Sequence, residues 1–345
     1  MRWVSLLAAL ASVLHAGTVD EAGVRNSVER AIPLLQKAGP AFTSRTGCIS
    51  CHHNVLPSMA VTAAHDRGFA VDMAAMNNML QVEAKYLEDR AGRILQGLPP
   101  PGAEDTMSYL LFALAASHVP GNDGTDAGVR YLKIRQAADG RWSIHTHRPP
   151  LEASSIALTA TTIRVLDAFA PPGQRAPYRE SIRRAAQWLE HATPRNTDEA
   201  SYRLAGLIWA DAAPAAVAQA AMALARAQRP DGGWSQLTTL ESDAWATGEA
   251  LVTLEAAGMK TTDSVYARGV AFLVRTQFPD GSWHVKTRSE AIQPYFESGF
   301  PYGPDQWISA AGTSWAVTAL SLTQPAASVR AAHRRTAGLR CPRLS

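Results

Sequence analysis

The stretch Gln228-Arg-Pro-Asp-Gly-Gly-Trp234 decides the fold, because it occurs three times. The other copies are Gln136-Ala-Ala-Asp-Gly-Arg-Trp142 and Gln277-Phe-Pro-Asp-Gly-Ser-Trp283. The second and third copies start 49 residues apart, and the first two start 92 apart, which is close to two periods. A fixed period of this length is typical of stacked helical units. A degenerate copy is expected in between, and residues 181–189 match the helix that precedes each motif.

Each period contains two helical patterns of different character. The helix before a motif is amphipathic: in residues 181–190, Ile182 and Leu189 lie on one face and charged side chains lie on the other. The helix after a motif is apolar nearly all round, since residues 156–163 and 315–322 carry no charge. An amphipathic helix faces solvent on one side, whereas an apolar helix has to be covered on every side.

The same alternation extends to the N-terminal part and gives six inner and six outer helices. The inner helices are expected at residues 55–64, 109–116, 156–163, 201–210, 244–254 and 315–322. Hairpins with an apolar inner partner close into a double ring, because each inner helix is buried only against its neighbours. We therefore predict an all-α fold, a single (α/α)6 toroid over residues 20–325.

The three motifs resemble the repeat of the squalene-hopene cyclase and protein prenyltransferase superfamily. The resemblance covers residues 20–325 and implies that superfamily's helical toroid, but fold does not imply reaction. In the motif, Asp can accept backbone N–H groups of a turn, Gly can take a positive φ angle, and Trp can cover the end of the preceding helix. We therefore expect Asp139, Asp231 and Asp280 to be structural.

A different motif, Cys48-Ile-Ser-Cys-His-His53, occupies the corresponding loop of the first hairpin. Two cysteines separated by two residues and followed by histidine are typical of c-type haem attachment. In this interpretation Cys48 and Cys51 form thioethers to the haem, and His52 is the proximal ligand of the iron. The sequence thus predicts a covalent haem c and an electron-transfer or haem-dependent redox role.

Several side chains could supply the sixth iron ligand. His145, His147 and His284 follow the tryptophans of two motifs, and Met59 or Met107 in nearby inner helices could offer a thioether. Taken singly, each histidine is better explained as a solvent-facing loop residue.

Two other chemistries remain open for Cys48 and Cys51. Zinc would use both thiolates with His52 or His53, and its fourth ligand would have to come from a distant loop. A redox dithiol normally opens a helix in a βαβ unit, which this sequence lacks. Haem is the preferred cofactor and zinc the less favoured alternative.

The two ends of the chain carry targeting and charge signals. Arg2, an apolar run and a small-residue cleavage point predict a signal peptide at residues 1–16, and hence a periplasmic or secreted protein. Residues 326–345 form a basic tail that contains Cys341 and is expected to be disordered. A net charge of +3 gives no reason to expect a nucleic-acid partner. No segment after the signal peptide has the length and apolarity of a membrane span.

The superfamily resemblance also suggests an acid catalyst. The triterpene cyclases protonate their substrate with an Asp-x-Asp-Asp cluster, and the nearest approach in this chain is Glu241-Ser-Asp243. Burial can raise one pKa of such a pair and make it a general acid. However, helix dipoles favour acids at helix N-termini in any case. Equivalent places are held by Asp105, Glu152, Asp198 and Glu199.

The last loop between helices, residues 293–307, is long and rich in aromatic side chains. These should pack over the mouth of the ring against a haem or a lipid-like ligand, or else form a lid on the protein's own core.

Three functions follow from these features. The favoured one is an exported haem protein with a redox partner. The second is a terpene cyclase-like isomerase, with Asp243 or Glu241 as the acid and an apolar small molecule as substrate. The third is a binding module without catalysis.

Overall fold

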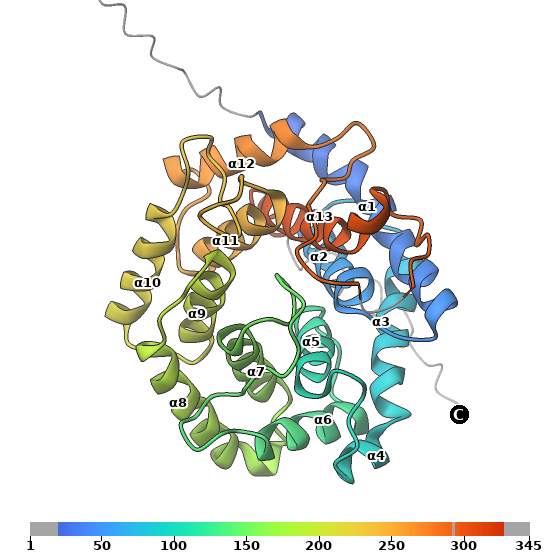
Figure 1. Cartoon of the computed structure of the whole chain (residues 1–345), viewed down its shortest axis with the longest axis vertical. Helices are drawn as coiled ribbons and strands as arrows, with labels where there is room; N and C mark the ends of the chain where they lie inside the picture. The colour runs from blue at the N-terminus through green and yellow to red at the C-terminus, as the bar shows by residue number, and fades with distance from the viewer. Residues whose placement is uncertain (1–19, 292–293, 328–345) are drawn as a thin grey trace, which may run out of the picture.

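The computed structural model describes residues 20–291 and 294–327, in which the helices form two concentric rings (Figure 1). The described residues contain no β-strand longer than an isolated bridge. The inner ring consists of α2 (Leu56–Asp66), α5 (Ala103–Ala116), α7 (Ser155–Phe169), α9 (Thr197–Trp209), α11 (Ala244–Ala256) and α13 (Gln306–Ser321). The outer ring consists of α1 (Glu21–Thr46), α3 (Met73–Glu88), α6 (Asp123–Ile134), α8 (Arg175–His191), α10 (Pro214–Arg226) and α12 (Ser264–Thr276). A short helix, α4 (Ala91–Leu95), is added after α3. The predicted all-α toroid is confirmed.

The signal peptide predicted at residues 1–16 lies outside the described residues, as does Cys341 in the tail. Within the described part of the chain, no helix combines the length and apolarity needed to cross a membrane.

The inner helices are buried because they are apolar nearly all round. Each packs against the next around the ring, and α13 returns to pack against α2. Gly248 shows how closely α11 and α13 approach, because a Cβ atom there would lie 2.5 Å from the backbone carbonyl carbon of Trp315. The ring therefore has a tight helix-to-helix core.

The outer helices bury only one face. In α8, Ile182 and Leu189 are buried while Arg183 is exposed, as the amphipathic pattern predicts. The first outer helix is longer than the amphipathic pattern of residues 24–37 predicts: α1 continues through Pro40 to Thr46 and ends where Gly47 takes a φ of +65°.

The repeated Gln-to-Trp segments join neighbouring hairpins. The side-chain amide of Gln228 donates to the carbonyl oxygens of Gly232 (2.8 Å) and Val265 (2.7 Å), and its oxygen accepts from Arg268. Gly232 has a φ of +93°, and a Cβ atom there would lie 2.6 Å from the carbonyl oxygen of Arg268. The indole N–H of Trp234 donates to a carbonyl in the last turn of α10 (2.8 Å). One glutamine thus links its own turn to the outer helix of the next hairpin.

The last such segment closes the ring. The amide of Gln277 donates to the carbonyl oxygen of Ser27 in α1 (2.8 Å), and Arg30 donates to its oxygen. Gly281 lies against α1 in the same way, since a Cβ atom there would lie 2.5 Å from the carbonyl oxygen of Arg30. The end of α12 is thereby fixed to the first helix of the chain (Figure 1).

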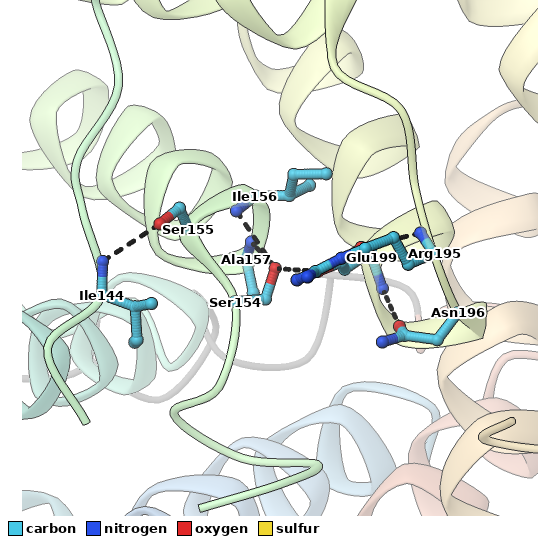
Figure 2. Close-up of polar contacts among 8 residues, drawn as sticks. All are labelled: Ile144, Ser154, Ser155, Ile156, Ala157, Arg195, Asn196 and Glu199. Carbon is cyan, nitrogen blue, oxygen red and sulfur yellow. Dashed lines mark hydrogen bonds and ion pairs between the residues drawn. The ribbon is translucent and has the colours of Figure 1, made fainter. Parts of the chain in front are cut away.

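The hairpin of α8 and α9 lacks a Gln-to-Trp segment, and helix caps hold the neighbouring inner helices together instead. Ser154 caps α7 and donates to Glu199 Oε1 (3.2 Å) at the start of α9 (Figure 2). Glu199 also accepts from the backbone and the guanidinium of Arg195, and Asn196 caps α9 by accepting from the Glu199 N–H (2.8 Å). These contacts fix the start of two inner helices relative to each other.

Candidate active site

A cavity of about 520 Å³ opens at the face of the ring where the inner helices begin. It is enclosed by the segments that precede or begin α2, α5, α7 and α13. The segment between α6 and α7 reaches toward the middle of the ring to form one wall (Figure 1). Aromatic side chains that line the cavity are Phe42, Tyr86, Tyr295 and Trp307. Its charged or nucleophilic lining includes Cys48, Cys51, His52, Arg148, Glu152 and Glu290.

The described part of the aromatic loop, residues 294–307, contributes to this cavity. Tyr295 and Trp307 line it, while Phe300 is buried and Tyr302 packs against His284 with ring centroids 4.7 Å apart. The loop thus covers the mouth with part of its aromatic side chains and packs on the protein with the others.

Glu152 is the buried acid on the cavity wall. Its Oε1 accepts a hydrogen bond from the thiol of Cys51 (3.0 Å), and its Oε2 forms an ion pair with Arg148 (2.8 Å). Its backbone takes a φ of +45°, a left-handed conformation that is strained for a residue with a side chain. Such strain is concentrated at functional sites, where the surrounding structure maintains it. The loop before α7 therefore fixes the position of the Glu152 carboxylate despite the backbone strain at this residue.

Asp105 is the charged neighbour of Glu152 at the start of α5. The hydroxyl oxygen of Thr146 lies 3.1 Å from Asp105 Oδ2 and 3.0 Å from the carbonyl oxygen of Glu152, so it bridges the two residues. Burial, and then the charge of Glu152, raise the pKa of Asp105 to about 7. The pair therefore holds a proton near neutral pH.

The thiol of Cys51 donates its hydrogen to Glu152. Burial, and then the charge of Glu152, hold the pKa of Cys51 well above its ordinary value. The sulfur thus stays protonated and donates to the carboxylate, so it is a poor nucleophile.

Two adjacent imidazoles follow Cys51, and that of His52 lines the cavity. A π-helical turn, Cys51–Val55, places Nδ1 of His52 2.7 Å from Nδ1 of His53. Phe42 and Trp307 pack around the ring of His52, with centroid distances of 5.2 and 5.3 Å. Burial, and then the charge of Arg148, lower the pKa of His52 to about 3. Burial, and then His52, hold the pKa of His53 well below its ordinary value.

A second group of acids lies on α9 and α11. Asp198 and Glu249 are buried, with 6% and 1% of their surfaces exposed. Burial raises the pKa of Asp198 to about 7, and burial together with the charge of Asp198 raises that of Glu249. Neither carboxylate oxygen of Glu249 has a hydrogen-bond partner among the described residues. A proton on Glu249, shared with Asp198, would supply the missing donor.

The acids predicted from the sequence occupy two different environments. Asp243 caps α11, accepting from the Ala246 N–H (2.9 Å) and from Gln236 (2.8 Å), and burial raises its pKa to about 6. Arg288 donates to Gln236 (2.7 Å) and so joins Asp243 to the group around Asp198. Glu241 is exposed in the loop before α11. The catalytic roles of Asp243 and Glu241 stay predictions.

The side chains named as possible sixth iron ligands are dispersed. His145 and His147 are exposed in the segment before α7. The ring of His284 is 2.7 Å from Asp305, with which it pairs. Met59 is half-buried in α2, and Met107 is fully buried in α5.

Comparisons with known proteins match at the level of fold. No protein-family model and no curated protein matches the chain. Among solved structures, a glycosidase in complex with glucose is similar with a TM-score of 0.59 and 12% identity, covering 89% of this chain and 100% of that one. The type II terpene cyclase MstE from Scytonema is similar with a TM-score of 0.56 and 16% identity, covering 88% and 98%. A protein from Actinoplanes has a TM-score of 0.56, 15% identity and coverage of 88% and 99%. At these identities the likeness shows the fold alone.

The predicted haem function and haem cofactor are contradicted by these comparisons, in which the similar structures are terpene cyclases and glycosidases. The residues present do not fit a c-type haem either. A thioether at Cys51 would remove the hydrogen that Glu152 accepts and leave a buried carboxylate with less compensation. His52 contacts His53 through Nδ1 and packs between aromatic rings. Cys48, Cys51 and His52 are therefore corrected from haem-binding residues to parts of the cavity wall.

The zinc alternative is wrong for a geometric reason. Within residues 20–291 and 294–327, no three His, Cys, Asp or Glu side chains are grouped so as to hold a metal ion. The thiol of Cys51 is directed at the Glu152 carboxylate.

The sequence places Asp105 and Glu152 only among the acids expected at helix N-termini, because their local context is that of ordinary capping residues. The useful signal was the sequence Arg148-Pro-Pro-Leu-Glu152, where a rigid segment delivers an arginine and an acid to the start of an inner helix.

Proposed function

We propose that this protein is an enzyme that protonates an apolar, isoprenoid-like substrate in its cavity and releases an isomerised or cyclised product. The observation that carries the proposal is the pair of Asp105 and Glu152, of which Glu152 lies on a cavity wall that is otherwise mostly apolar and aromatic. Burial raises the pKa of Asp105 to about 7, while Glu152 pairs with Arg148 and accepts a hydrogen bond from the thiol of Cys51. A carboxyl group whose pKa lies near the working pH is what general acid catalysis needs.

The pair can deliver its proton to a carbon–carbon double bond. In this step Asp105, the buried member, passes its proton to Glu152, which lines the cavity and donates that proton to the substrate. The π electrons of the alkene form the new C–H bond, and a carbocation remains on the neighbouring carbon. The ring faces of Phe42, Tyr86 and Trp307 can stabilise that cation, and the carboxylate left behind balances its charge. Loss of a proton from an adjacent carbon completes the reaction.

The fold supports this proposal over a redox function. MstE is a type II terpene cyclase, and one of its structures contains geranylgeranyl dihydroxybenzoate as substrate. That substrate combines a long isoprenoid chain with an aromatic head, a chemistry that an aromatic-lined cavity with a polar rim can accommodate. We extend the substrate class, and not the individual compound, to this chain.

A second candidate is glycoside hydrolysis. It is favoured by the same two carboxyl groups, because glycosidases use one protonated and one ionised acid. The glycosidases of similar fold make this class the appropriate comparison. The mostly apolar wall of the cavity favours the isoprenoid substrate.

The test is product analysis after incubation with two probe classes. Geranylgeranyl dihydroxybenzoate and squalene represent isoprenoids, and a panel of aryl glycosides represents sugars. We expect turnover of an isoprenoid probe by the wild type, and a loss of at least about 100-fold in Asp105→Asn and Glu152→Gln. Glu180→Gln, which changes an exposed acid on α8, is the matched control and should keep wild-type turnover. Hydrolysis of an aryl glycoside with no conversion of the isoprenoids would select the second candidate, and wild-type turnover in both acid variants would refute the assignment of the acids.

A further inference from the structure

A chain of hydrogen bonds runs from Gln306, at the start of α13, to the cavity wall. The orientation of the Gln306 amide is fixed by its own contacts. The side-chain N–H of Gln306 donates to the carbonyl oxygen of Phe296 (2.7 Å), and its Oε1 accepts from the backbone N–H of Ser298 (2.8 Å). These two contacts set the orientation of the amide, so its oxygen faces Ser298.

The hydroxyl of Ser298 therefore donates its only hydrogen to Gln306 and can only accept from other groups. It contacts Gln306 Oε1, an atom that carries no hydrogen, so the hydroxyl is the donor there. Its oxygen already accepts from the backbone N–H of Phe300 (3.3 Å). Because its single hydrogen is used, Nε2 of His53, 2.8 Å away, must donate to the hydroxyl oxygen.

The tautomer of His53 then determines that of His52. His53 is fully buried and neutral, so a hydrogen on Nε2 leaves Nδ1 as an acceptor. Nδ1 of His52 lies 2.7 Å from that acceptor and must carry the hydrogen. In a neutral His52 ring, Nε2 consequently has a free lone pair.

That lone pair is available to a bound molecule. His52 lines the cavity. Its Nε2 makes no hydrogen bond to any described residue, yet it is not one of the buried atoms that lack a partner. The nitrogen therefore faces open space, on a cavity that also presents Glu152.

We propose that His52 is the catalytic base that ends the reaction, held in its active tautomer by His53, Ser298 and Gln306 as positioning residues. The inference rests on the proposed function. The Nε2 lone pair removes a proton from the carbon next to the cation, and the electrons of that C–H bond become the new double bond. His52 becomes an imidazolium and then returns its proton to the carboxyl pair of Asp105 and Glu152, so that acid and base are both restored.

The tautomer is tested without any substrate. In the full chain labelled with ¹⁵N-histidine, long-range ¹H–¹⁵N correlation spectra distinguish protonated from bare ring nitrogens. We expect one ring, absent from His52→Gln, to show a protonated Nδ1 and a bare Nε2. A hydrogen on Nε2 of this ring would overturn the inference, whatever the activity of the enzyme.

The positioning chain is tested by a pair of serine variants. Ser298→Ala removes the acceptor of His53, so His52 should show a mixture of both tautomers and turnover should fall about tenfold. Ser314→Ala, in which a buried hydroxyl that donates within α13 is removed, should keep the single tautomer and the wild-type rate. An unchanged spectrum in Ser298→Ala would overturn the chain.

Activity separates this inference from the proposed function. His52→Gln should lower turnover of the isoprenoid probe by about 100-fold, as expected for loss of a general base. If Asp105→Asn and Glu152→Gln lose turnover while His52→Gln retains it, the base assignment fails and the proposed function stands. If no isoprenoid is converted by the wild type, the proposed function fails, and the base assignment fails with it.

Discussion

At the scale of single residues, neighbouring acids in this ring behave differently because their partners differ. Burial alone would raise the pKa of Glu199, but its hydrogen bonds with Arg195 and Ser154 hold it below its ordinary value. Asp198, one residue earlier, has no such guanidinium partner at hydrogen-bond distance among the described residues, and burial raises its pKa to about 7. Glu199 is therefore a structural anion, whereas Asp198 resembles Asp105 in storing a proton.

Glu83 gives a residue-scale prediction about stability. It is fully buried between α3 and α2, where Ser58 donates to its Oε2 (3.3 Å), and burial raises its pKa from 4.5 to about 8. The folded state therefore binds a proton that the unfolded chain releases, so stability from Glu83 is complete below pH 4.5 and is lost as the pH rises to about 8. We expect the free energy of unfolding to fall by a few kcal/mol, on the order of 1.4 kcal/mol per unit of pKa shift, over this window.

The measurement is urea unfolding at pH 5 and pH 9. The glutamine in Glu83→Gln is neutral at both pH values. In this variant the free energy of unfolding should therefore fall less between pH 5 and pH 9 than in the wild type. Glu88→Gln changes an exposed acid on the same helix. In this control the free energy of unfolding should fall between pH 5 and pH 9 by as much as in the wild type. An equal fall in the free energy of unfolding in Glu83→Gln and the wild type would show that Glu83 is not protonated in the folded protein.

At the scale of elements, the Gln-to-Trp segments carry the connection between hairpins. Gln228→Ala removes two donated hydrogen bonds and leaves Arg268 and the carbonyl of Val265 without their partner. With about 1 kcal/mol for each lost hydrogen bond, we expect a destabilisation of about 2–3 kcal/mol in chemical denaturation. Gln219→Ala, on the exposed face of α10, is the matched control and should change stability very little. A similar loss in both variants would contradict a joining role for Gln228.

The sequence predicts the helices well because their character is local. Residues 244–254 are apolar apart from Glu249 and match α11, and residues 181–190 are amphipathic and fall within α8. The candidate site is not predicted by local pattern, because Asp105 and Glu152 are brought together only by loops of separate hairpins. The motif at Cys48 and Cys51 points to haem when its spacing alone is considered, and only the fold shows the thiol of Cys51 directed at Glu152. Local pattern thus specifies elements, whereas the chemistry of a motif depends on what the ring places beside it.

At the scale of the whole molecule, the ring is closed by residues more than 240 positions apart. Gln277 and Gly281 after α12 bind the backbone of α1, while α13 packs against both α1 and α2. Because the cavity is formed by the segments before α2, α5, α7 and α13, its shape depends on that closure. The closing contact is therefore part of what maintains the site, although it is made on the outer ring.

Gly281→Ala tests this dependence. Gly281 has a φ of +91°, and an added Cβ atom would lie 2.5 Å from the carbonyl oxygen of Arg30, so the variant combines backbone strain with a clash against α1. Gly258→Ala is the matched control, because Gly258 has the same φ of +91° with no atom within 4 Å of the added carbon. We expect about 1–2 kcal/mol of destabilisation for the control, which has strain alone, and at least about 3 kcal/mol for Gly281→Ala. Hydrogen exchange should become faster in α1 and α12 of Gly281→Ala but stay unchanged in α7, on another part of the ring. Faster exchange spread evenly over all helices would mean that the contact supports general stability and not the closure of the ring.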